Sequence, residues 1–117
     1  MFARRERLKV LFREELALAL RGVKDPGLSG LLTVTDLVLS PDMKTATVFY
    51  SIIGSGLQRQ TSAEALERAS PFLRQVLKKR LSLKMIPQLV FTYDDTPARA
   101  ARVEKLLIQL EKEGGQE

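Results

Sequence analysis

The side chains with the clearest chemical potential are cations that follow one another without an intervening acid. One run of six lies between residues 68 and 84: Arg68, Arg74, Lys78, Lys79, Arg80 and Lys84. A second group lies in the first 13 residues, where only Glu6 is acidic: Arg4, Arg5, Arg7, Lys9 and Arg13. Clustered guanidinium and ammonium groups are typical of a surface that binds the phosphates of a polyanion.

Three interpretations of the run from Arg68 to Lys84 remain open. In the one that we favour, Arg74 and Lys78 line a helix flank that contacts phosphates. Alternatively, the cations are divided among solvated faces, because adjacent helical positions diverge, or some of them pair with Glu67, Asp94 or Asp95. The favoured interpretation predicts that charge reversal at Arg74 and Lys78 weakens association with the polyanionic partner and leaves the fold intact.

The residue types that most enzymes use are missing from the chain. The sequence has no His and no Cys, which removes the commonest general base, the thiol nucleophile and the usual zinc ligands. An enzyme would have to use carboxylates such as Asp94 and Asp95, and adjacent residues at a strand end usually point apart. We therefore expect no catalytic residue, no metal, no cofactor and no small-molecule substrate.

The elements that must position the cations belong to one small domain. A chain of 117 residues with 44% hydrophobic residues has room for one core, and its net charge of +5 fits a polyanionic partner. No apolar run is long enough to span a membrane, so we expect a protein of the cytoplasm. Apolar spacing predicts an amphipathic helix over Ala3 to Arg21.

A β-hairpin should follow this helix. The segments Leu31 to Leu39 and Lys44 to Ile53 are rich in β-branched and aromatic residues, and Ser40 to Met43 suits a type I turn. In the second strand Ala46, Val48, Tyr50 and Ile52 share one face. Asp36 interrupts the alternation of the first strand, which suggests a bulge or an edge position without deciding between them.

Two helices should come next, separated by a kink. Thr61 and Glu64 form a capping-box pattern that opens a helix to about Ala69. Pro71 cannot continue that helix, so Ser70 is expected to cap a second one that runs to about Leu83.

The last elements are a third strand and a terminal helix. Leu89 to Tyr93 alternate as a strand that closes at Asp94 and Asp95. A C-terminal helix is expected over about 97–112 and a flexible tail over 113–117. The result is one α+β domain over residues 1–112, whose core spans about 4–95 and whose three-stranded sheet is covered by helices on one face.

This order resembles the type II KH domain, and the residues resemble the ribosome-binding factor A family over about residues 4–95. The matching positions are Arg5, Arg7, Lys24 to Pro26, Ser40, Asp42, Ala46, Val48, Tyr50, Leu73, Arg74, Leu77, Pro87, Leu89, Phe91 and Asp94. The family usually has an Ala-x-Gly kink at the helix junction, whereas this chain has Ala69, Ser70 and Pro71. Because Pro71 offers no backbone N–H, we expect cationic side chains to make the RNA contact instead.

The resemblance implies a monomeric cytoplasmic factor of ribosome biogenesis, not an enzyme. Such a factor binds the immature small ribosomal subunit through its ribosomal RNA and assists late ribosomal RNA processing and subunit maturation, often with importance in the cold. The predicted RNA-binding residues are Arg4, Arg5, Arg7, Arg68, Ser70, Arg74, Lys78, Lys79, Arg80 and Lys84. The alternatives are a protein-interaction module, a general RNA-binding module without a role in assembly, and a duplex DNA binder.

Overall fold

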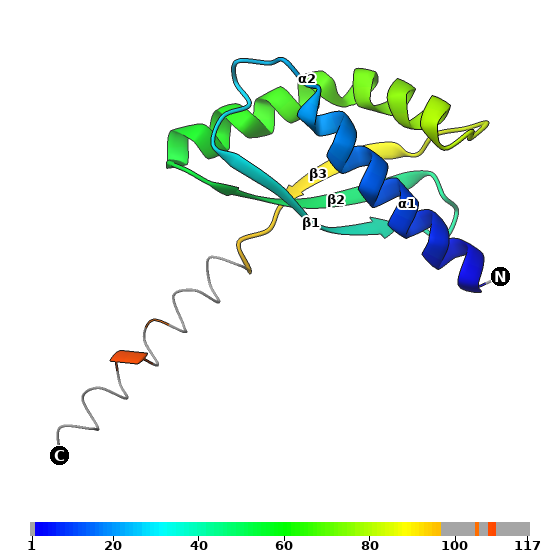
Figure 1. Cartoon of the computed structure of the whole chain (residues 1–117), viewed down its shortest axis with the longest axis horizontal. Coiled ribbons are helices and arrows are strands. Elements are labelled where there is room, and N and C mark those ends of the chain that lie inside the picture. The colour runs from blue at the N-terminus through cyan, green and yellow to red at the C-terminus, as the bar shows by residue number, and fades with distance from the viewer. Residues whose placement is uncertain (1, 97–104, 106–107, 110–117) are drawn as a thin grey trace.

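A computed structural model of the chain describes residues 2–96, 105, 108 and 109 (Figure 1). Its elements in chain order are α1 (Phe2–Arg21), β1 (Leu31–Leu39), β2 (Thr45–Ile53), α2 (Gly56–Arg80) and β3 (Gln88–Tyr93). None of the described helices is long and apolar enough to cross a membrane. The expected C-terminal helix over about 97–112 and the tail lie largely outside the described residues.

The three strands form one mixed sheet in the order β1-β2-β3. β1 and β2 are antiparallel, whereas β3 runs parallel to β2, which requires the crossover that α2 supplies. The register shifts between Val34 and Asp36. The two possibilities left open for Asp36 therefore both apply, because it follows a bulge and lies in an edge strand.

One face of the sheet carries both helices and encloses the core (Figure 1). The predicted inner face of β2 is confirmed, since Ala46, Val48, Tyr50 and Ile52 are all buried. Fully buried leucines and a phenylalanine from the helices pack against this face: Phe12, Leu16, Leu66, Leu73 and Leu77. The opposite face of β2 is only partly covered, as the alternation predicts.

The prediction of two helices separated by a kink at Ser70 is wrong, because α2 is one helix with Pro71 inside it. It also begins earlier than expected. Ser55 is the N-cap, and its capping box is completed by Gln58, not by Thr61 and Glu64. Pro71 is exposed, so the carbonyl of Glu67 that it leaves without a helical partner lies on the solvated side of the helix.

Candidate nucleic-acid interface

Arg68 lies in a structural ion pair. Its Nε and Nη2 donate to the two carboxylate oxygens of Asp25, both at 3.0 Å. This hydrogen bond, together with one from the N–H of Gly27, lowers the pKa of the Asp25 carboxyl, and the pair raises the pKa of Arg68. A bidentate pair of this kind fixes the loop after α1 against α2. Arg68 is therefore less available to a phosphate than the sequence suggests.

Arg74 supports the loop that leads into β3. Its Nη2 donates to the carbonyl of Ile86 at 3.1 Å, and its Nε donates to that of Pro87 at 3.3 Å. The side chain is half-buried against this loop. Charge reversal at Arg74 would remove these donors from the loop carbonyls, which counts against the expectation that it leaves the fold intact.

The remaining cations near the end of α2 are divided between two directions. Lys78 and Lys79 are exposed, and adjacent helical residues point about 100° apart. Arg80 turns toward α1, where its Nε lies 3.6 Å from the Oε2 of Glu15. Lys84 is exposed on the loop after α2. Among the described residues, Lys78, Lys79 and Lys84 form no ion pair.

The cations at the start of α1 lie near the hairpin turn. Arg5 Nη2 donates to the carbonyl of Leu39 at 2.9 Å, whereas Arg4 and Arg7 are exposed. Arg4 and Arg5 line a shallow cavity of about 270 Å³ together with Leu8, Pro41 and Met43. This contact brings the N-terminal arginines to the β1–β2 turn.

The first turn of α1, the hairpin turn and the loop after α2 lie at the same end of the molecule (Figure 1). The N–H of Gln88 donates to the carbonyl of Lys44 at 2.9 Å, and this bond joins the loop after α2 to the hairpin turn. We call this region the basic end, defined by seven cations: Arg4, Arg5, Arg7, Lys44, Lys78, Lys79 and Lys84. The segments that carry six of the ten predicted site residues thus lie at one end of the molecule, whereas Arg68 lies beside the loop after α1.

Sequence reasoning missed Lys44, which was assigned to the strand. It is exposed beside the hairpin turn, and its N–H donates to Asp42 Oδ1 at 3.0 Å. Asp42 also accepts from the hydroxyl of Ser40 at 2.7 Å, and these bonds lower the pKa of its carboxyl. The carboxylate therefore shapes the turn that presents Lys44.

Ser70 is half-buried inside α2 and does not cap a second helix. It lies one turn before Arg74, on the flank of α2 that faces β3. The structure therefore places it outside the basic end, and its contact with RNA stays a prediction.

The aromatic residues are mostly structural. Tyr50 is buried, which raises the pKa of its hydroxyl, and its ring lies edge-on to that of Tyr93 at 5.6 Å. The guanidinium of Arg59 covers Tyr93, 4.7 Å from the ring centroid. Since Arg59 and Tyr93 are 34 positions apart, no local sequence pattern could have predicted this contact. The rings of Tyr50 and Tyr93 therefore offer little open surface for stacking on bases.

The carboxylates considered for catalysis also have structural partners. Asp94 Oδ2 accepts from the hydroxyl of Thr35 at 2.7 Å, and Asp94 Oδ1 accepts from the N–H of Thr96 at 2.9 Å. Across the described residues, no group of three or more acidic side chains is placed to hold a metal ion.

The fold and the basic end define a small α+β domain with a cationic surface at one end and both helices on one face of its sheet. The family model of ribosome-binding factor A matches residues 4–107, and the chain belongs to this family. It is 47% identical over 106 residues to ribosome-binding factor A of Frankia casuarinae. The matched residues make up 90% of this chain and 62% of the Frankia protein. The chain thus spans less than two thirds of that relative.

One crystal structure and one fitted homology model have the same fold. The crystal structure of ribosome-binding factor A from Thermus thermophilus matches with a TM-score of 0.67 and 27% identity, over 75% of this chain and 92% of that one. A homology model of Thermus thermophilus ribosome-binding factor A, fitted into the cryo-electron-microscopy map of its complex with the 30S subunit, matches with a TM-score of 0.64 and 27% identity, over 75% of this chain and 92% of that one. The predicted family and the α+β class are confirmed.

Proposed function

We propose that this protein binds the immature small ribosomal subunit by laying its basic end on ribosomal RNA, and thereby assists late ribosomal RNA processing and maturation of the subunit. It acts in the cytoplasm as a monomer, by binding and without catalysis. The likeness to this family further implies that the protein is important in the cold.

The observation that carries this proposal is the set of exposed cations at the basic end. Lys78, Lys79 and Lys84 have no ion-pair partner among the described residues, so their charge is available to a polyanion. Three separate segments contribute cations there, which allows contact with several phosphates at once. The relative from Thermus thermophilus that was fitted into a 30S complex supports the choice of partner.

The proposal is tested by co-sedimentation of the purified protein with immature small subunits. Lys78→Glu and Lys84→Glu should each reduce the affinity by roughly tenfold, because a phosphate contact is replaced by repulsion. Arg74 is avoided here because it supports a loop. Lys24→Glu is the matched control, since it makes the same change of charge at an exposed position far from the basic end.

If all three variants bind equally well, the basic end is not the contact surface. If both basic-end variants lose binding to the subunit but retain their affinity for its isolated ribosomal RNA, the surface serves a protein contact instead. Circular dichroism of each variant shows whether the fold is intact.

A further inference from the structure

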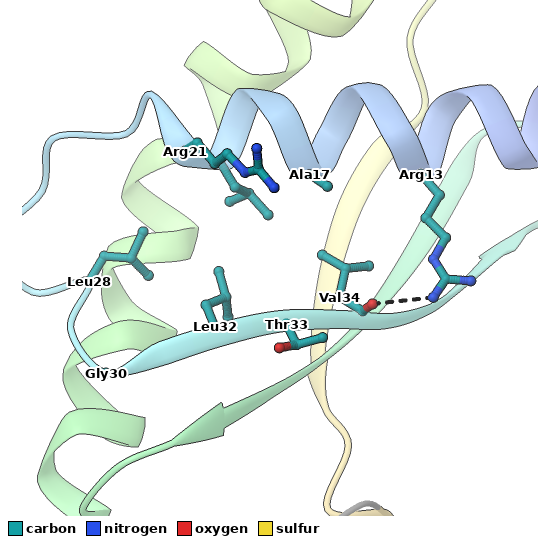
Figure 2. A pocket seen from close by; sticks show the side chains of 9 residues that line it. Arg13, Ala17, Arg21, Leu28, Gly30, Leu32, Thr33 and Val34 are labelled. Atoms are coloured by element: carbon teal, nitrogen blue, oxygen red, sulfur yellow. Dashed lines mark hydrogen bonds between the residues drawn. The ribbon is translucent and has the colours of Figure 1, made fainter.

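A groove lies between α1 and β1, away from the basic end. It encloses about 460 Å³ and is lined by one flank of α1, the loop before β1 and the first half of β1. Figure 2 shows Arg13, Ala17 and Arg21 on the helix side, with Leu32 and Val34 on the strand opposite. The three helical residues are four positions apart and so lie on the same flank of α1.

The groove has an apolar floor and a cationic rim. Leu20, Leu28, Leu32 and Val34 supply the floor, Arg13 and Arg21 form the rim, and no acid of the described segments lines the groove. Arg13 donates only long hydrogen bonds, to the carbonyls of Val34 at 3.4 Å and Thr35 at 3.3 Å. Within the described part of the chain, Arg21 has no ion-pair partner. Both guanidiniums can therefore receive a carboxylate.

One wall of the groove is an edge strand. Among the described strands, β1 has a neighbour only on its β2 side, and Val34, whose carbonyl accepts from Arg13, lines the groove. An edge strand beside an apolar groove suits an extended peptide, whose alternate side chains enter the groove while its backbone runs along the strand. Phosphates and sugars fit less well, because an apolar floor offers no compensation for their lost hydration.

We propose that this groove binds an extended segment of a partner protein in which apolar and acidic side chains alternate. The apolar side chains lie on Leu28, Leu32 and Val34, and carboxylates pair with Arg13 and Arg21. This site is independent of the proposed contact with ribosomal RNA, because none of its lining residues belongs to the basic end. It gives the protein a second surface, through which a protein ligand can bind while RNA occupies the first.

The test follows the backbone amide signals of the full, isotope-labelled chain by NMR while a short peptide of alternating valine and glutamate is added. The signals that shift should belong to residues 13–21 and 28–34. Arg21→Glu should weaken binding by roughly tenfold, because it replaces attraction with repulsion. Ala17→Trp should also weaken it by filling the groove. Lys24→Glu is the control of equal charge and should bind as the unmodified chain does.

Three results would overturn the proposal. The first is that the glutamate peptide leaves the signals of the groove unchanged, and the second is that a valine–lysine peptide binds equally well. The third is that a single-stranded oligonucleotide displaces the glutamate peptide and shifts the same signals, which would make the groove a phosphate site. Because no ribosomal subunit takes part, these outcomes do not depend on the proposed role in assembly.

Discussion

At the scale of single residues, cations of similar type differ in what they can do because of what they contact. Arg68 is held by Asp25 and Arg74 by two loop carbonyls, whereas Lys84 extends into solvent. The run of charge from 68 to 84 was visible in the sequence. The partners were not, because Asp25 lies 43 positions before Arg68 and the pairing depends on how the loop after α1 packs on α2.

The pair between Arg68 and Asp25 should make stability depend on pH in the acid range. The pKa of Asp25 is lower in the folded state, so its stabilising effect is complete above the unfolded pKa and is lost as pH falls through the folded pKa. Asp25→Asn should therefore be less stable than the unmodified protein at neutral pH, and the difference should shrink in acid. Urea unfolding across this range measures it.

Arg68→Gln supplies the matching control for this prediction, since it removes the other half of the pair. The stability that Arg68→Gln loses at neutral pH should likewise shrink over the same pH range. A deficit of Asp25→Asn that stays constant with pH would show that the substitution acts through something other than the ionised pair.

At the scale of elements, local patterns located the strands well but misjudged α2. Leu31–Leu39 was predicted with the observed bounds, because β-branched residues and a polar turn delimit it. Pro71 appeared to end a helix, yet the apolar stripe of Leu66, Ala69, Leu73 and Leu77 continues past it in phase. Burial of that stripe outweighs the local cost of an exposed proline, a comparison that sequence patterns alone do not make.

The cap of α2 can be tested directly. Ser55 accepts a hydrogen bond from the N–H of Gln58 at 3.1 Å, so Ser55→Ala should lower the free energy of unfolding by about 1 kcal/mol. Thr61→Ala, at the position that the sequence suggested as the cap, should cost little, because it lies inside the helix where alanine is favoured. Thermal or urea denaturation of both variants distinguishes the two caps. A larger loss for Thr61→Ala would contradict the assignment.

At the scale of the whole molecule, three segments bring their cations to one end, although the net charge is only +5. The hydrogen bond of Arg5 to Leu39 and that of Gln88 to Lys44 join these segments. The position of Lys44 beside the loop after α2 depends on the pairing of β2 with β3, and this pairing could not be read from the sequence. Two clusters far apart in the chain therefore reach the same end of the molecule only after folding.

Affinity for small-subunit ribosomal RNA should fall linearly with salt on logarithmic axes, because bound cations release counterions. Lys84→Ala should reduce the slope by about one, the contribution of a single phosphate contact. Lys24→Ala should leave it unchanged. Filter binding or fluorescence anisotropy over a range of potassium chloride concentrations measures both slopes, and a flat response for the unmodified protein would count against a phosphate contact.

The parallel pairing of β3 with β2 has a consequence for how the protein comes into being on a translating ribosome. The last strand completes the sheet, buries Leu89 and sets the loop that Arg74 supports, yet it is synthesised after every other described strand. A nascent chain that ends at α2 leaves one edge of β2 unpaired and part of the interior open to water. Completion of the interior must therefore wait until nearly all of the domain has left the exit tunnel.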